Sequence, residues 1–173
     1  MRDTRDCLLV DGYNMIGGWP ELASLSKNDL EEARDRLLAR LADYQAFSGR
    51  KVIVVFDAYR VPGLGKSFAQ YKVDIHFTKE KETAYECIER LVGELMNRRR
   101  QIYVATSDMV EQHVIFGQGA LRVSARELLT QVEQSEKEIQ VRLQERSSNS
   151  SRNTIDGKLS PEVRKMFERW RRE

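Results

Sequence analysis

Three short, mostly apolar stretches, each running into an aspartate, set the strongest limit on how this chain can fold. The stretches are 7–10, 52–56 and 102–107, and the acids that follow them are Asp11, Asp57 and Asp108. A run without polar alternation is typical of a strand buried on both faces, as in a parallel sheet. Parallel strands end at a common edge, where open α/β sheets place their ligand crevices. We therefore predict that the three aspartates lie at one edge of a central sheet.

The segments between these stretches predict the connections of a parallel sheet. Residues 29–47 carry apolar side chains at helical spacing between the first two strands, which indicates a βαβ unit with a right-handed crossover. We expect a half-exposed edge strand at 71–77, helices over 83–97 and 109–116, and a short strand at 121–123. The predicted fold class is α/β, with a mostly parallel sheet of four or five strands and helices on both sides.

The C-terminal part predicts a helical extension of this domain. A capping-box pattern at Ser124 starts a helix over 125–144. Polar residues 147–159 are expected to form a linker, and a serine and a proline then begin a basic amphipathic helix over 160–173. We therefore assign residues 1–146 to the α/β domain.

Bulk properties bear on location more than on partners. The net charge of the 173 residues is +2, so whole-chain charge indicates no particular partner. The two cysteines, Cys7 and Cys87, fall in a predicted strand and a predicted helix, as expected of reduced thiols. The sequence shows no signal peptide and no apolar run of transmembrane length. We expect a cytoplasmic protein without a membrane partner.

Carboxylates that meet at one sheet edge indicate a divalent metal site. Like charges held together repel unless a cation lies between them. A cluster of oxygen ligands suits Mg²⁺ or Mn²⁺ rather than zinc, and such an ion can promote phosphodiester cleavage. Each acid alone has a second interpretation, as the cap of a helix or turn. Asn14, three residues after Asp11, either orients a water or phosphate or bonds within its own turn.

The motifs around these acids resemble one known family. They are LVDGYNMI at 9–16, VVFDA at 54–58, ATSD at 105–108, FTKEKETA at 77–84, IFGQGAL at 115–121 and FERWRR at 167–172. The first three resemble the NYN branch of PIN-like nucleases. The others narrow the resemblance to the YacP-like, ribosome-associated endoribonucleases of bacteria. The resemblance covers nearly the whole chain.

The resemblance implies a metal-dependent endoribonuclease that cuts messenger RNA on the translating ribosome, at the aminoacyl site. It makes residues 1–146 the nuclease domain, with Mg²⁺ or Mn²⁺ as cofactor. Asp11 and Asp108 are the first expected metal ligands, and Asp57 is a further candidate. Asn14 and Ser107 are expected to position water or phosphate.

One residue departs from the family pattern. The family reads Glu-Thr-Ala-Asp-Glu where this chain has Glu82-Thr83-Ala84-Tyr85-Glu86, so a phenol replaces an acid of the cluster. An uncharged phenol is a poor ligand for a hard cation. Three explanations stay open: a natural variant in which Glu82 or Glu86 supplies the carboxylate, a natural nuclease of low activity, or a substitution made to inactivate the enzyme or trap a complex. On a helix, Glu82 shares a face with position 85, whereas Glu86 points about 100° away.

Basic side chains predict the RNA-binding surface. Arg122 and Arg126 follow a glycine-rich turn and are expected to face the crevice. Arg169, Arg171 and Arg172 lie on the terminal helix, where they are candidates for ribosomal RNA phosphates. The alternative for that helix is a solvated amphipathic helix docked through its apolar side.

Two other functions stay open. The first is an RNA- or ribosome-binding module that no longer cuts, for which Tyr85 is the main support. The second is a phosphoesterase of small molecules, in which the basic tail would have no role. Trp19, Tyr13 and Tyr59 have two interpretations each, as platforms for unpaired bases or as packing residues.

Overall fold

The computed structural model describes residues 3–58, 72–107, 119–152 and 161–171. The chain divides into two compact units, residues 1–136 and 137–173, which are described separately.

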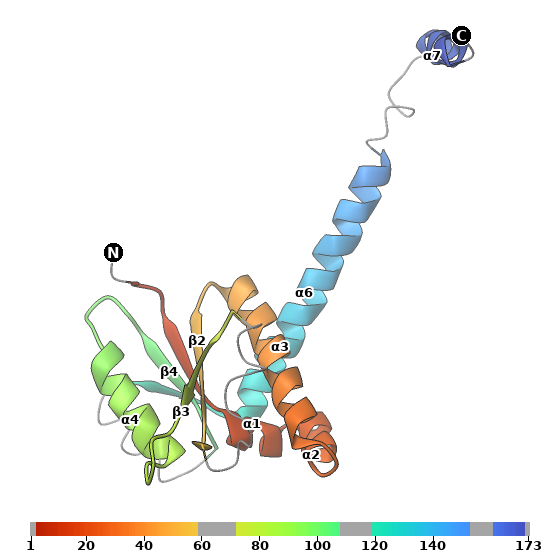
Figure 1. Cartoon of the computed structure of the whole chain (residues 1–173). Coiled ribbons are helices and arrows are strands. Elements are labelled where there is room, and N and C mark those ends of the chain that lie inside the picture. Colours follow the sequence, from red (N-terminus) through yellow and green to blue (C-terminus); the bar gives the residue numbers. More distant parts are fainter. Residues whose placement is uncertain (1–2, 59–71, 108–118, 153–160, 172–173) are drawn as a thin grey trace. The chain divides into compact units, whose positions relative to one another are not determined.

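A parallel sheet forms the centre of the first unit (Figure 1). Within the described residues it has five strands in the order β3-β2-β1-β4-β5, and each pairing is parallel. The strands are β1 (Cys7–Asp11), β2 (Lys51–Phe56), β3 (Asp74–Phe77), β4 (Ile102–Ala105) and β5 (Leu121–Val123). The predicted α/β class is confirmed, and the half-exposed strand β3 lies at a sheet edge as expected.

The central strand β1 is buried along its whole length. Leu8 and Val10 pack into the core on one face of the sheet, whereas Cys7 and Leu9 pack into the core on the other. Helices α1 (Gly12–Gly18), α2 (Pro20–Ser26), α3 (Leu30–Ser48) and the start of α6 (Ala125–Arg152) cover the first face, and α4 (Ala84–Leu95) covers the second (Figure 1). Because both faces need apolar side chains, β1 shows no polar alternation.

Helix α1 was not predicted, because residues 12–20 contain three glycines and a proline, which interrupt helices. The helix forms since Asp11 caps it, accepting a hydrogen bond from the backbone N–H of Asn14 at 3.4 Å. Trp19 then separates α1 from α2. Its side chain is fully buried, and its indole N–H donates to the carbonyl of Ala125 at 2.9 Å. A base-stacking role for Trp19 is therefore wrong.

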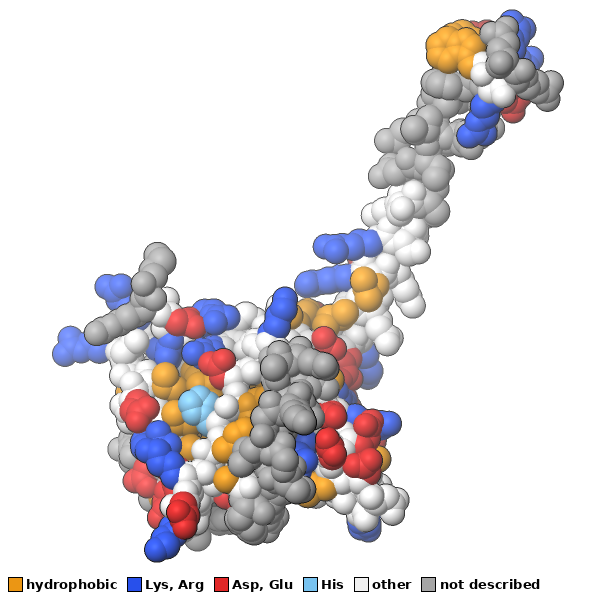
Figure 2. Space-filling model, in the orientation of Figure 1, with side chains coloured by type: hydrophobic (Ala, Val, Ile, Leu, Met, Phe, Trp, Pro, Cys, Tyr) orange, Lys and Arg blue, Asp and Glu red, His pale blue; other side chains and the backbone are white. Residues whose placement is uncertain are grey.

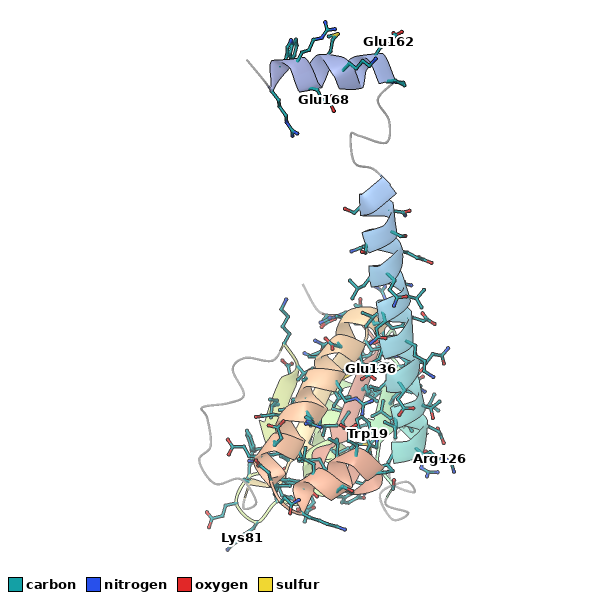
Figure 3. All side chains as sticks on the ribbon, turned by 90° about the vertical axis from the view of Figure 1, so that its right-hand side faces the viewer. Trp19, Lys81, Arg126, Glu136, Glu162 and Glu168 are labelled. Atoms are coloured by element: carbon teal, nitrogen blue, oxygen red, sulfur yellow. The ribbon has the colours of Figure 1, made fainter. Side chains whose placement is uncertain are left out.

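Side-chain bonds fasten the first turns of α6 to α3. Arg40 donates two hydrogen bonds to the carboxylate of Glu136, at 2.7 and 3.1 Å. The Tyr44 hydroxyl lies 3.0 Å from Oε1 of Gln131. Figure 3 shows Trp19 and Glu136 along the side where α3 and α6 pack. These bonds hold the start of α6 on the same face as α1 and α2.

The second unit is helical where it is described. Helix α6 continues to Arg152, so the predicted helix end at 144 is wrong, as is the predicted linker over 147–152. The reason is that residues 121–156 contain no glycine or proline to stop a helix. The rest of the predicted linker, 153–159, lies outside the described residues.

Helix α7 (Pro161–Trp170) begins at the expected proline. The domain limits at 146 and 159 stay predictions. None of the described helices is both long and apolar enough to cross a membrane.

Gly12 provides a test of the packing between α1 and the end of β2. A Cβ added there would lie 2.2 Å from a ring carbon of Phe56, whereas a Cβ at Gly17 would meet no heavy atom within 4 Å. We expect Gly12→Ala to lower the free energy of unfolding by about 1–3 kcal/mol, because the ring has to move. The matched control Gly17→Ala should change it by less than about 1 kcal/mol. Urea unfolding of both variants measures this, and equal stabilities would contradict the close contact.

Candidate active site

The candidate site lies at the carboxyl edge of the sheet, where neighbouring strands end together. Asp11 closes β1 and pairs in register with Val55 of β2, so Asp57 follows two residues beyond that partner. On the other side of β1, strand β4 ends at Ala105. Asp108 follows three residues later and lies outside the described residues. The register therefore brings Asp11 and Asp57 to one edge, as predicted.

Asp11 and Asn14 are held by hydrogen bonds at this edge. Only 9% of Asp11 is exposed, and its carboxylate is oriented by its bond to the Asn14 backbone. The side-chain oxygen of Asn14 accepts a hydrogen bond from the backbone N–H of Ser107 at 2.8 Å. Neither interpretation of Asn14 from the sequence included this bond. It ties the first turn of α1 to the segment that leads from β4 to Asp108.

Asp57 connects β2 to the start of α4. Its Oδ1 accepts a hydrogen bond from the backbone N–H of Ala84 at 3.1 Å. The capping interpretation therefore holds for one oxygen of this half-buried carboxylate. No hydrogen bond to its second oxygen is found within the described part of the chain. Asp57 can thus offer one oxygen to a ligand while it anchors the helix that carries Tyr85.

The start of α4 explains how the two glutamates near Tyr85 are used. Thr83 caps the helix, and its backbone N–H donates to Glu86 at 2.8 Å in a capping box. Glu82 therefore precedes the helix, and the expectation that it shares a helical face with Tyr85 is wrong. Its carboxylate accepts hydrogen bonds from the backbone of Lys79 at 2.8 Å and from Arg90 at 3.1 Å. A metal ion at Glu82 would have to compete with both donors.

These same donors set the charge state of Glu82. The backbone N–H of Lys79 and, after it, the guanidinium of Arg90 lower the pKa of this carboxyl, and they outweigh the opposing effect of burial. The side chain is 14% exposed. Glu82 is therefore held as a carboxylate that strengthens the loop before α4.

A cavity of about 610 Å³ opens beside Asp57. Its lining consists of Asp57, Ala58 and residues 78–83 of the loop between β3 and α4. Two of the lining residues, Lys79 and Lys81, are exposed cations that the sequence analysis did not single out. The signal for them was the basic and acidic run TKEKE at 78–82. Figure 3 shows Lys81 at the tip of this loop, where a lysine can meet a phosphate in solvent.

The predicted RNA-binding arginines that the structure describes lie in both units. Arg122 is half-buried on the edge strand β5, and Arg126 is exposed in the first turn of α6 (Figure 3). Both therefore belong to the β5 side of the sheet, whereas the cavity belongs to the β3 side. Arg169 and Arg171 are exposed in the second unit, and Arg172 lies outside the described residues. Their binding roles stay predictions.

The described donors agree in chemistry with a hard divalent cation. Asp11, Asp57 and Asn14 offer only oxygen atoms as ligands, which suits Mg²⁺ or Mn²⁺. Within the described ranges, no group of three or more His, Cys, Asp or Glu side chains is placed to hold a metal ion. The third predicted acid, Asp108, lies outside those ranges. The predicted triad therefore stays a prediction.

The ion pair of Glu82 gives a pH-dependent prediction. Because its pKa is lowered in the folded protein, Glu82 contributes stability above the ordinary glutamate pKa of about 4.3, and this contribution is lost as the pH falls further. Glu82→Gln should therefore unfold at a lower urea concentration than the unmodified chain at pH 7, and the gap should close in acid. Glu80→Gln, in the same loop, is the exposed control. A gap that is independent of pH would contradict the ion pair.

Comparison with known proteins supports the resemblance. A family model described as "YacP-like NYN domain" matches residues 8–172. The chain is 54% identical over 167 residues to the "Uncharacterized protein YacP" of Bacillus subtilis. The matched region covers 96% of this chain and 97% of that protein.

Solved structures agree with this result. The crystal structure of Rae1 (YacP) from Bacillus subtilis matches with a TM-score of 0.78 at 54% identity, over 96% of this chain and 95% of that one. The structure of a tryptophan-to-leucine mutant of Rae1 matches with a TM-score of 0.73 at 53% identity, over 83% and 84% of the two chains. The chain therefore belongs to the YacP-like NYN-domain family, whose fold is that of PIN-like nucleases.

Proposed function

We propose that this protein is a metal-dependent endoribonuclease that cleaves messenger RNA in association with the translating ribosome. The observation that carries the proposal is the setting of Asp11. It is a buried carboxylate at the carboxyl end of the central parallel strand, beside an asparagine bonded to the segment before Asp108. Membership of a family with a nuclease fold supports the same reaction.

Each residue at the sheet edge has a distinct role in this proposal. Asp11 and Asp108 would hold a divalent ion, with Asp57 as a further ligand. Such an ion, when bound, neutralises phosphate charge and favours hydroxide over water. The oxygen of Asn14 is used by Ser107, so its NH₂ group is the part that can donate to a phosphate oxygen or a water.

The cations of the first unit would guide the RNA backbone past these acids. Lys79 and Lys81 border the cavity beside Asp57, and Arg122 and Arg126 lie toward the β5 side. An RNA strand that crosses the carboxyl edge of the sheet would meet positive charge on both sides of Asp11. Such contacts orient a single strand without reading its sequence.

The terminal helix α7 supports association with ribosomal RNA. Met166 is 53% exposed and Trp170 is 67% exposed, next to the exposed Arg169 and Arg171. Figure 2 shows hydrophobic and basic side chains together on this helix. An aromatic surface mixed with arginines is typical of proteins that bind RNA through stacking and phosphate contacts.

A module that binds RNA without cutting is the second candidate, and the start of α4 favours it. Glu82 is bonded to Lys79 and Arg90, and Glu86 completes the capping box. Both oxygens of Glu82 and one oxygen of Glu86 are therefore already bonded, so neither side chain is free to turn toward position 85 without breaking a hydrogen bond at the start of α4. Because Tyr85 is a poor ligand for a hard cation, we expect metal binding to be weaker and cleavage slower than with an aspartate at this position.

Restoring the family acid tests which candidate is right. Tyr85→Asp should raise the cleavage rate with Mg²⁺ or Mn²⁺ by about tenfold or more, because it adds a carboxylate ligand. Tyr85→Phe, which keeps the ring, should leave the rate unchanged. Equal rates for Tyr85→Asp and the unmodified chain would show that position 85 does not limit cleavage.

The reaction itself is tested on translating ribosomes. New RNA ends that appear with the unmodified or Tyr85→Asp protein should disappear with Asp11→Asn, which keeps the cap oxygen but loses the negative charge. Mapping the ends by sequencing locates the cut relative to the aminoacyl site. If the unmodified and Tyr85→Asp proteins both bind ribosomes but produce no new RNA ends, the RNA-binding module is the better interpretation.

Charge removal on α7 tests the ribosome contact. Arg169→Gln/Arg171→Gln should weaken ribosome binding and lower its salt dependence, because each phosphate that is no longer neutralised reduces the log–log slope by about 0.7–0.9. Lys137→Gln/Arg146→Gln on the exposed part of α6 is the control of equal charge. Cosedimentation with ribosomes at several salt concentrations measures the effect. If both double variants bind equally, α7 is not the contact, and the small-molecule phosphoesterase becomes the better alternative.

A further inference from the structure

Two arginines of the described chain are buried and have an Nε atom without a hydrogen-bond partner, Arg34 and Arg100. Arg100 has other partners, because it donates to the backbone carbonyl of Asp3 and lies 3.8 Å from the Asp3 carboxylate. Arg34 differs. Its one hydrogen bond within the described residues runs from Nη1 to the hydroxyl of Tyr13 at 3.2 Å.

The setting of Arg34 is unfavourable for stability. The side chain is only 4% exposed, and no carboxylate of the described chain forms an ion pair with it. A guanidinium remains charged in proteins, and a buried charge is costly unless it is paired. An apolar side chain of similar length would fill the same space without this cost. Packing alone therefore does not account for an arginine at this position of α3.

Its partner, Tyr13, belongs to the helix that begins at the candidate site. Tyr13 stands between Asp11 and Asn14 in the first turn of α1. Its ring forms a T-shaped contact with the ring of Phe56, with the two centroids 5.1 Å apart. Phe56 is the residue before Asp57, so Tyr13 follows one of the two described aspartates in the chain and contacts the residue that precedes the other.

We propose that Arg34 is a positioning residue for the candidate site. By donating to the Tyr13 hydroxyl, it fixes the first turn of α1 and thereby sets the side chains of Asp11 and Asn14. The consequence for cleavage rests on the proposed function, whereas the positioning does not. Active sites commonly keep such unfavourable groups at a cost in stability.

Arg34→Met tests this inference, with Arg100→Met as the matched control. Removal of the unpaired charge should leave the thermal midpoint of Arg34→Met equal to or above that of the unmodified chain. Arg100→Met should lower the midpoint, because it breaks the contact with Asp3. A large loss of stability in Arg34→Met would overturn the claim that the charge is kept at a cost.

Hydrogen exchange at one amide reports the positioning directly. The N–H of Ser107 is bonded to Asn14, so loosening the first turn of α1 should speed its exchange about tenfold in Arg34→Met, without faster global unfolding. Tyr13→Phe, which removes the acceptor, should have the same local effect. Unchanged Ser107 exchange in both variants would overturn the inference.

Cleavage kinetics separate this inference from the proposed function. If the protein cuts RNA, Arg34→Met should lower kcat about tenfold or more and change KM by less than about twofold, because it misplaces the reacting groups rather than the RNA contacts. Arg100→Met should leave both constants unchanged. Faster Ser107 exchange together with no cleavage by the unmodified chain would support the positioning and refute the nuclease. An unchanged kcat in an active protein would refute the role of Arg34 in the reaction.

Discussion

Burial of β1 on both of its faces is the condition under which the candidate site can exist. Its side chains alternate between two cores, so the strand is held in a fixed register between β2 and β4. That register determines where each neighbouring strand ends. Asp11 therefore takes its position from apolar packing, not from attraction between the acids, which would repel one another in the absence of a cation. The core supplies the free energy that holds like charges at a single edge.

The polar groups at this edge serve the fold and the site at once. Asp11 caps α1, and Asp57 accepts a hydrogen bond from the first residue of α4, so each acid is oriented by the start of a helix. Asn14 joins α1 to Ser107 across the sheet edge. A carboxylate that also caps a helix is held in one rotamer, which reduces the entropy lost when a ligand binds. Local folding rules thus orient the side chains whose remaining polar atoms a metal or phosphate would use.

The sheet could be predicted from the sequence because its strands are apolar runs between segments with helical spacing. The apolar runs and the helical spacing between them predicted the βαβ unit, and the alternation over 71–77 predicted an edge strand, observed as β3. Asp11 and Asp57 were placed correctly because parallel strands share an edge.

Other features depended on contacts that no local pattern shows. The glycines of residues 12–18 argued against a helix there. Helix α1 forms because Asp11 caps it and its apolar residues reach the core. The burial of Trp19 depends on a carbonyl 106 residues away. Arg34 and its bond to Tyr13 could not be found from spacing, since they join two different helices. Nor did any local pattern indicate that Glu82 is bound to Arg90.

The start of α4 concentrates negative charge, and this bears on the meaning of Tyr85. Asp57, Glu82 and Glu86 all accept hydrogen bonds from residues at or just before the first turn of this helix. A fourth carboxylate at position 85 would add repulsion that only a cation at the site could offset. Tyrosine removes that repulsion and a metal ligand together. The same substitution should therefore stabilise the metal-free protein, and, under the proposed function, it should weaken metal binding and slow cleavage.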